Sequence, residues 1–245
     1  MCGKQGCDAD EALAAEGMNR PWHKADPGLL DKTRDEVQEL YPNLHFYPQN
    51  GHVVVRGSLP IIDAGKELDR YSVEIVLLAD YPDAVPLVRE TGGKIPHHAD
   101  RHVNKESGEA CLFIPDERWN IYPPGTTFLK FLNGPVRNFF LGQSIFHRTG
   151  EWPFGQRPHG SAGIREYYSE LLGTDDVTVI LGYLECLSRP TLKGHWACPC
   201  KSGKRVRDCH CYQISELRMK ISGEIAEKSY RSLRDNTDKM GGKRI

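Results

Sequence analysis

The sequence predicts an α+β fold from three features: an N-terminal helix, a run of alternating apolar segments and a helix-rich second half. The first helix is expected over 27–40, because Asp26 is a favoured N-cap and Pro27 a favoured first helical residue. Tyr41-Pro42 ends it, since the residue before a proline disfavours the helical conformation. The buried stripe of this helix comprises Leu30, Val37 and Leu40.

Alternating apolar residues after this helix predict an antiparallel meander. Strands are expected at 52–56, 71–79 and 87–90. One face of the second strand carries Tyr71, Val73, Ile75 and Leu77. A long irregular segment, 91–125, follows the meander and contains Cys111.

Helical periodicity returns after the irregular segment. Helices are expected at 126–141, 163–172, 175–187 and 214–233. The inward side chains of the first of these are Phe128, Leu132, Val136 and Phe139 or Phe140. The last is a charged tail with a thin apolar stripe of Ile214, Leu217, Ile221 and Ile225. A helix, a meander, an irregular segment and further helices together make up the predicted α+β arrangement.

Composition and charge exclude several classes of function. The 245 residues include 32 basic and 33 acidic side chains, so the net charge of -1 gives no bulk attraction to nucleic acid or membrane. No apolar run is long enough to span a bilayer, and residues 1–7 lack the apolar core of a signal peptide. We therefore expect a cytoplasmic protein. In that reducing compartment its 8 cysteines are expected to be thiols, metal ligands or a nucleophile.

Cys111 has the most informative sequence context in the chain. The tripeptide His102-Val-Asn104 precedes it, Gly108 lies three residues before it, and Leu112 follows it directly. Further elements of the pattern are Tyr81-Pro82 upstream and Trp119 downstream. A lone cysteine is most often a buried structural thiol. This combination of neighbours is much more particular than a lone cysteine.

The order of these elements resembles the active-site stretch of ubiquitin-conjugating enzymes, which carry Y-P, a strand, H-P-N, a short loop, G-x-I-C-L and a downstream Trp. The resemblance covers residues 28–172, and it implies the ubiquitin-conjugating fold and thioester chemistry. It implies that Cys111 is the acyl acceptor and nucleophile. It also implies that Asn104 orders the loop and stabilises an oxyanion, and that His102 is mainly structural.

Three departures from the family pattern indicate a divergent, bacterial-type relative. Val103 replaces the motif proline, Ala110 replaces the usual Ile or Val, and the loop before Cys111 is one residue shorter than is common. These departures weaken any assignment of ubiquitin itself as the cargo. The Gly/Pro-rich segment 150–160 is expected to be a surface loop rather than a cover for the site. The side chains with which it would cover the site are Trp152, Arg157 and His159.

A second cluster begins at Cys198 and reads C-P-C-K-S-G-K-R-V-R-D-C-H-C. Two thiols one residue apart, a Ser-Gly turn and a later Cys-His pair supply four ligands suited to tetrahedral zinc. The spacing resembles the SEC-C motif, best known from the tail of the SecA translocation ATPase. The expected ligands are Cys198, Cys200, Cys209 and His210, with Cys211 as an alternative to His210.

A closed site of this kind implies a structural Zn²⁺ rather than a catalytic one. Basic side chains close to it predict docking to a protein or an anionic surface; they are Lys201, Lys204, Arg205 and Arg207.

The chain is thus predicted to have four parts. Residues 1–25 form a flexible N-terminus and 26–190 a ubiquitin-conjugating-like catalytic domain. Residues 195–212 form the SEC-C-like zinc motif, and 213–245 form a charged helical tail.

A conjugating-like acyl carrier is the favoured function, because both Asn104 and Cys111 are present. Stand-alone proteins that it resembles belong to bacterial antiphage systems of the CBASS type, where they act on a nucleotidyltransferase related to cGAS. The expected partners are a protein whose C-terminus is conjugated, such as that cyclase or a ubiquitin-like protein, and an activating enzyme. Neither a membrane nor nucleic acid is an expected partner of such an enzyme.

Two other functions are compatible with the sequence. One is a catalytically inactive module that holds a ubiquitin-like protein or nucleic acid. The other is a thiol hydrolase that pairs Cys111 with His97 or His98, which ranks last because no Cys-His peptidase signature is present.

Overall fold

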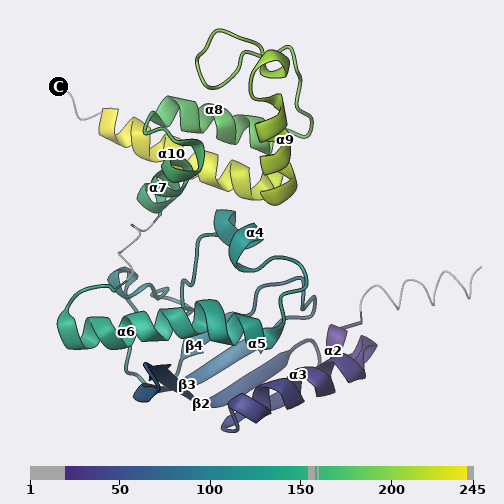
Figure 1. Cartoon of the computed structure of the whole chain (residues 1–245), viewed down its shortest axis with the longest axis vertical. Coiled ribbons are helices and arrows are strands. Elements are labelled where there is room, and N and C mark those ends of the chain that lie inside the picture. Colours follow the sequence, from purple (N-terminus) through teal and green to yellow (C-terminus); the bar gives the residue numbers. More distant parts are fainter. Residues whose placement is uncertain (1–19, 154–157, 159, 242–245) are drawn as a thin grey trace, which may run out of the picture. The chain divides into compact units, whose positions relative to one another are not determined.

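The structure is a computed structural model in which residues 20–153, 158 and 160–241 are described. The chain forms two compact units, which Figure 1 shows in ribbon form. We call Met1–Leu112 with Pro124–Pro153 the sheet unit, and Phe113–Pro123 with Phe154–Ile245 the helical unit. The sheet unit contains a four-stranded antiparallel sheet and the helical unit is built from helices, so the predicted mixed α+β class is confirmed.

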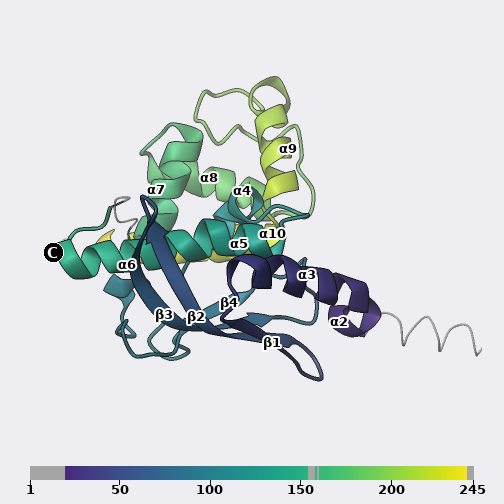
Figure 2. The ribbon, with the colours of Figure 1, turned by 60° about the horizontal axis from the view of Figure 1, so that its bottom comes forward.

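The sheet is a meander in the order β1-β2-β3-β4, and neighbouring strands are antiparallel (Figure 2). The strands are β1 (Leu44–Pro48), β2 (Val53–Asp63), β3 (Lys66–Leu77) and β4 (Leu87–Glu90). The predicted strand 87–90 is confirmed, and the predicted strands at 52–56 and 71–79 are parts of the longer β2 and β3. The strand β1 was not predicted; it is short, ends in Pro48 and has one fully buried side chain, that of Leu44.

One face of the sheet is apolar and buried, whereas the other is charged. The predicted face of β3 is confirmed by four side chains that are at most 3% exposed: Tyr71, Val73, Ile75 and Leu77. On the opposite face Arg56, Glu74 and Arg89 form ion pairs across β2, β3 and β4, with N–O distances of 2.7 and 3.1 Å. Only one face therefore needs a cover of helices.

The helical segments of the sheet unit are α2 (Trp22–Ala25), α3 (Pro27–Leu40), α5 (Phe128–Phe131), the π-helical turn η3 (Leu132–Val136) and α6 (Arg137–Thr149). Helix α6 packs across the sheet (Figure 2). On the apolar face the ring of Phe140 lies 4.7 Å from that of Tyr71. Helix α3 lies next to β1 and α5.

The predicted first helix is confirmed as α3. The Asp26 carboxylate accepts a hydrogen bond from the backbone N–H three residues later at 3.0 Å, as an N-cap does. Leu30 and Val37 are buried, but Leu40 is 57% exposed, so its assignment to the buried stripe is wrong. Leu40 is the last helical residue, and Thr33 is instead the third buried residue of α3.

The predicted helix 126–141 is two helices separated by a kink. Gly134, between α5 and α6, has non-helical dihedral angles of φ -101° and ψ -105°, and Pro135 follows it. Proline lacks the N–H that an α-helix needs and its ring clashes with the preceding turn, which explains the interruption. Four of the predicted inward side chains are at most 1% exposed: Phe128, Leu132, Val136 and Phe140.

The elements of the helical unit are η2 (Pro115–Glu117), α4 (Arg118–Ile121), α7 (Ser161–Leu172), α8 (Val177–Ser188), η4 (Val206–Asp208), α9 (Cys211–Lys220) and α10 (Gly223–Gly241). Helices α7 and α8 confirm the predicted helices at 163–172 and 175–187. The predicted helix 214–233 is two helices, because α9 ends at Lys220 and Ser222 begins a new one. The Ser222 hydroxyl accepts a hydrogen bond from the backbone N–H of Ile225 at 3.3 Å.

The two units divide the chain differently from the predicted ranges. The predicted boundary near residue 190 places α7 and α8 in a different part from η4, α9 and α10. In the structure these elements share one apolar core. Helix α10 packs along α8 (Figure 1), so the described part of 213–245 contributes to that core rather than forming an appended tail. Fully buried members of the core include Tyr168, Ile180, Leu184, Val206, Ile214 and Ala226.

Two further observations bear on the predicted ends and on membranes. Most of the predicted flexible N-terminus, residues 1–19, lies outside the described residues, and Trp22 of α2 is buried against the Tyr81 ring at 4.7 Å. Among the described residues, no helix is both long and apolar enough to cross a membrane.

Candidate thiol site and candidate metal centre

Cys111 lies in a small hairpin that continues the sheet beyond β4. Val103 and Ala110 pair as an antiparallel bridge. The backbone N–H of Asn104 donates to the carbonyl of Glu109 at 2.8 Å, and that of Cys111 donates to the carbonyl of His102 at 2.8 Å. These bonds give the cysteine a defined backbone position although it lies in a segment predicted to be irregular.

The hairpin is fastened to β4 by backbone and side-chain contacts. The N–H of Ala110 donates to the carbonyl of Val88 at 2.8 Å. The Arg89 guanidinium donates to the carbonyl of Ser107 at 3.1 Å and pairs with the Glu109 carboxylate at 2.7 Å. The row of ion pairs on the charged face of the sheet therefore extends to Glu109, two residues before Cys111.

The pairing sets which side chains share a face of the hairpin. Val103 is 5% exposed and faces the core. Side chains alternate along a strand and directly paired residues point the same way. Asn104, Glu109 and Cys111 therefore lie on the face opposite Val103, and Cys111 is exposed. The two motif residues expected to do chemistry are thus brought to one face.

Asn104 uses its side-chain carbonyl to hold the turn of the hairpin. Its Oδ1 accepts hydrogen bonds from the backbone N–H groups of Glu106 at 2.9 Å and Ser107 at 3.0 Å. Its amide nitrogen donates to no acceptor among the described residues. That nitrogen is the group that can hydrogen-bond a developing oxyanion.

Gly108 is required by the shape of this turn. Its φ is +69°, and a Cβ at this position would lie 2.7 Å from Cε1 of His97. A side chain would therefore clash with the imidazole ring and strain the backbone. The glycine of the sequence motif has a steric role here.

His102 holds the loop through its backbone and its ring. Its carbonyl accepts the Cys111 hydrogen bond, and its own N–H donates to the carbonyl of Ala99 at 2.7 Å. Its ring meets the edge of the Trp152 ring at a centroid distance of 5.0 Å. Trp152 in turn stacks on Phe146 at 4.7 Å. The backbone and the ring of His102 thus both contact the surroundings of Cys111.

The environment of Cys111 favours the neutral thiol. Desolvation of the sulfur, and then the negative charge of Glu109, raise the pKa of Cys111 above its ordinary value. The thiol makes no hydrogen bond within the described residues, whereas a thiolate activated by histidine needs an imidazole beside it. His97 lies against Gly108, and the His98 ring accepts from the N–H of Asp100 at 3.3 Å.

Other predicted site residues are placed elsewhere or not described. Trp119 belongs to the helical unit, where its indole N–H donates to the Tyr167 hydroxyl at 3.0 Å. Arg157 and His159 lie outside the described residues. Trp152 packs on α6, where it would contact a Cβ at Gly142 at 3.3 Å.

The second predicted site assembles fully in the helical unit. Ligand atoms of Cys198, Cys200, Cys209 and His210 all lie within 4.8 Å of one another, so the group can hold a metal ion. The His210 Nδ1 lies 3.2 Å from both Cys198 Sγ and Cys209 Sγ, and the Cys200 and Cys209 sulfurs are 3.6 Å apart. Cys211 is outside this group and begins helix α9.

Local backbone structure brings the two ligand pairs together. Ala197 pairs with Arg205, and the N–H of Cys198 donates to the carbonyl of Lys204 at 2.9 Å, which closes a tight loop around the first two cysteines. Gly203 has a φ of +74°, which reverses the chain as the sequence pattern predicts. The short turn η4 then leads into Cys209 and His210.

The donor set fits a tetrahedral cation. Zinc ligands bound at about 2.0–2.3 Å in a tetrahedron lie roughly 3.3–3.8 Å apart, close to the 3.2–3.6 Å between these sulfur and nitrogen atoms. Burial raises the pKa of Cys198 to about 11. Burial acts in the same direction on Cys200, but hydrogen bonds from the Ser202 hydroxyl and N–H outweigh it and lower that pKa to about 6. The lowered pKa of Cys200 and the three further soft donor atoms beside it suit a bound cation.

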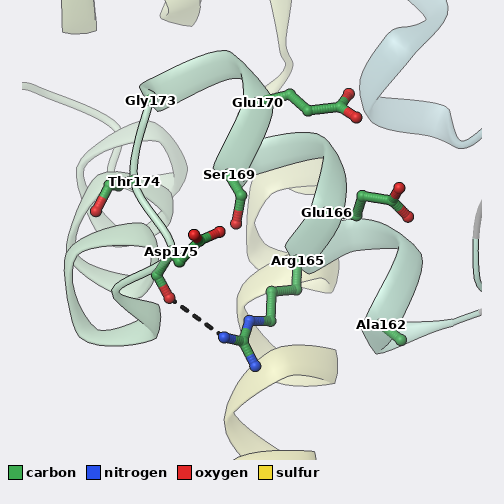
Figure 3. Close-up of a pocket in the computed structure, with 8 residues that line it drawn as sticks. All are labelled: Ala162, Arg165, Glu166, Ser169, Glu170, Gly173, Thr174 and Asp175. Carbon is green, nitrogen blue, oxygen red and sulfur yellow. Dashed lines mark hydrogen bonds between the residues drawn. The ribbon is translucent and has the colours of Figure 1, made fainter.

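A cavity along α7, in the helical unit, does not form a comparable site. It has a volume of about 600 Å³ and is lined from Ala162 to Asp175. Arg165 donates a hydrogen bond to the backbone carbonyl of Asp175 at 3.3 Å. The carboxylates of Glu166 and Glu170 extend away from that of Asp175 (Figure 3). Its acidic groups therefore do not converge.

Comparison with known proteins provides no relative: no protein-family model matches the chain, and neither a curated protein nor a solved structure is significantly similar to it.

Proposed function

We propose that this protein is an acyl carrier of the ubiquitin-conjugating kind, with Cys111 as the thioester-forming residue. The observation that carries the proposal is the exposed Cys111 thiol on a hydrogen-bonded hairpin that places Asn104 on the same face. The order of sequence elements around Cys111 supports the ubiquitin-conjugating fold in particular.

The proposed reaction is a thioester exchange followed by aminolysis. The Cys111 sulfur attacks the carbonyl of a cargo C-terminus held as a thioester on an activating enzyme. That enzyme's thiol leaves, and the Cys111 proton compensates its charge. An amine of the acceptor then attacks the new thioester, Cys111 leaves as the thiolate, and the amine proton restores the thiol.

Each hairpin residue has a defined part in this scheme. The Asn104 amide nitrogen stabilises the oxyanion of the tetrahedral intermediate, while its carbonyl keeps the turn in place. His102 positions Cys111 through the backbone. The raised pKa of Cys111 suits this chemistry, because it keeps the resting thiol neutral and limits side reactions.

The metal of the helical unit is proposed to be a structural Zn²⁺ held by Cys198, Cys200, Cys209 and His210 in a SEC-C-like knuckle. Three sulfurs and one imidazole nitrogen are soft ligands that suit zinc, and four protein ligands leave no open coordination position for catalysis. The ion would fasten the 197–205 loop to the start of α9. Its exposed basic neighbours, such as Lys204 and Arg205, suit docking to an acidic partner surface.

The proposed setting is a bacterial antiphage system of the CBASS type, in the cytoplasm. The cargo is then a protein C-terminus such as that of a cyclase related to cGAS or a ubiquitin-like protein, and a separate activating enzyme supplies it. The sequence resemblance alone supports this setting.

The alternative is a binding module that uses the same hairpin without chemistry. Co-expression with the neighbouring genes of the native operon separates the two. An acyl carrier gives an adduct on a non-reducing gel that disappears with a thiol reductant and is lost in Cys111→Ala. A module gives no covalent adduct, and identical adducts in wild type and Cys111→Ala would reject the enzyme.

A further inference from the structure

The sheet unit contains a polar cavity of about 350 Å³ that the proposed acyl transfer does not use. Side chains from β3, the loop after β4, the turn η1 (Ala99–Arg101) and helix α6 line it. They are Asp69, Tyr71, Lys94, Arg101, His147 and Arg148. Residues far apart in sequence thus converge on one concave surface.

The lining is strongly cationic. Lys94, Arg101 and Arg148 contribute three positive charges and Asp69 contributes one negative charge, although the whole chain carries a net charge of -1. The single carboxylate is already engaged. Asp69 accepts from Lys94 Nζ at 2.7 Å, from the N–H of Arg70 at 2.8 Å and from the Ser144 hydroxyl at 3.4 Å. The two arginines are left without a carboxylate partner in the described part of the chain.

Arg101 is held in place by a buried amide. Its Nε donates to Gln143 Oε1 at 2.8 Å, and Gln143 Nε2 donates back to the Arg101 carbonyl at 2.6 Å. Gln143 is 0% exposed and directs both of its polar atoms to Arg101. The guanidinium also lies 4.9 Å from the centroid of the Phe146 ring. Its two terminal nitrogens have no acceptor among the described residues, so a fixed pair of donors remains for a ligand.

The remaining cations are positioned by backbone carbonyls. Arg148 donates one terminal nitrogen to the carbonyl of Leu68. Lys94 donates to the carbonyl of Arg70 at 2.8 Å and lies 5.2 Å above the ring of Tyr71. Ordering these long side chains before binding lowers the entropy cost of binding an anion. Desolvation disfavours the charged form of Arg101 and lowers its pKa. A bound anion would offset this cost, because it supplies the missing negative charge.

We propose that this cavity binds a phosphate dianion, either free or as the phosphate group of a small monoester. Two guanidinium groups supply the planar, paired donors that phosphate oxygens accept, and a dianion matches the excess of positive charge. The volume lies at the lower end of small-molecule sites, which leaves space for a phosphate with a small organic group. The inference goes beyond the proposed acyl transfer, because none of the lining residues takes part in thioester chemistry.

The test is calorimetric titration of the full-length, metal-loaded protein at constant ionic strength. Inorganic phosphate and phenyl phosphate are the two probes, and sodium chloride is the blank. Wild type should bind one equivalent of at least one probe. Arg101→Gln should weaken that binding by about tenfold or more, since a charge-assisted hydrogen bond contributes roughly 1.5–3 kcal/mol.

Two further variants keep the test decisive. Arg148 is exposed on α6, so Arg148→Gln should fold. This variant should weaken binding, and it tests the proposal even if Arg101→Gln fails to fold. Arg34→Gln, which removes an exposed arginine of α3 paired with Asp31 at 2.6 Å, should leave the affinity unchanged. Tighter binding of phenyl phosphate identifies a monoester as the ligand, and tighter binding of phosphate identifies the free ion.

The proposal is overturned if wild type shows no saturable binding of either probe, or if Arg148→Gln and Arg34→Gln behave alike. Repeating the titration with Cys111→Ala separates this inference from the proposed function. Phosphate binding should persist in that variant whether or not Cys111 forms a thioester.

Discussion

The side-chain oxygen of Asn104 holds the turn and its amide nitrogen is proposed to stabilise an oxyanion, and this separation can be tested with two substitutions. Asn104→Asp keeps an oxygen for the N–H groups of Glu106 and Ser107 but removes the amide donor. It should keep a thermal midpoint near that of wild type yet slow aminolysis of the thioester by about 10²-fold, the effect of losing one oxyanion donor. Asn104→Ala should slow aminolysis similarly and also lose about 1–2 kcal/mol of stability.

The measurement for this prediction is single-turnover decay of a preformed thioester in the presence of an amine, with thermal unfolding of each variant. Normal aminolysis in Asn104→Asp would leave Asn104 with a structural role alone.

Glu109 should control the ionisation of Cys111. Its negative charge disfavours the thiolate, so Glu109→Gln lowers the pKa of Cys111 toward its ordinary value and increases the thiolate fraction at any pH below that pKa. Alkylation by iodoacetamide at pH 8 should become several-fold faster, and its pH profile should move to lower pH. Glu106→Gln, in the same turn, is the matched control and should leave the profile in place. Equal profiles for all three proteins would contradict this account.

Residue identities predict part of the Cys111 site and of the candidate metal centre, and the remaining contacts depend on the tertiary structure. The motif around Cys111 selects Asn104 and His102 as candidates, and the cysteine spacing points to the group that could hold a metal ion. The spacing leaves Cys211 as an alternative, and only the geometry separates it from His210. The contact of Arg89 with Glu109 could not be predicted, because it depends on the register of the hairpin against β4.

At the scale of elements, the loop of the candidate metal centre brings three sulfurs and an imidazole nitrogen within 4.8 Å of one another. A bound ion should therefore supply much of its stability, because metal-binding energy is folding energy in such sites. Protein purified without added metal should contain near-stoichiometric zinc by elemental analysis. Cys200→Ser should lose the metal, whereas Cys211→Ser should retain it because Cys211 lies outside the group.

Loss of zinc in both cysteine variants would place Cys211 among the ligands. A metal-free wild type whose 195–212 segment is fully folded by amide hydrogen exchange would reject a structural ion.

Helix and strand positions were predictable where periodicity was strong and sequence breakers were clear. Asp26 and Pro27 define the start of α3, and alternation defines the buried face of β3. The break at Gly134-Pro135 also has a signal in the sequence, although the apolar spacing on either side of it reads as one continuous helix. Strand β1 is only five residues long, ends in a proline and is held by its pairing with β2.

At the scale of the whole molecule, the division into units depends on contacts that a linear reading cannot supply. The segment Phe113–Pro123 belongs to the helical unit, although it lies between Cys111 and the helices of the sheet unit in sequence. Asp116 fixes it there. Its carboxylate is 2% exposed and accepts hydrogen bonds from the hydroxyls of Tyr168 at 2.6 Å and Ser229 at 2.9 Å.

This buried carboxylate should make the stability of the helical unit depend on pH. Burial raises the pKa of Asp116 in the folded chain. Above the unfolded pKa of about 3.9, unfolding therefore releases a proton, and stability falls as pH rises toward the folded pKa. Asp116→Asn keeps an acceptor but cannot ionise, so its thermal midpoint should fall less over that range. Asp208→Asn, at an exposed carboxylate of the same unit, should follow wild type.

The central claim is that Cys111 carries an acyl group, and intact mass measured on the Cys111→Ser variant tests it most directly. A serine ester persists where a thioester is lost, because an alkoxide is a poorer leaving group than a thiolate. Co-expressed with its operon neighbours, Cys111→Ser should gain the mass of one neighbour less one water, with the bond at residue 111 and sensitive to alkali. An adduct of the same mass on Cys111→Ala, or no adduct with any neighbour, would contradict the account.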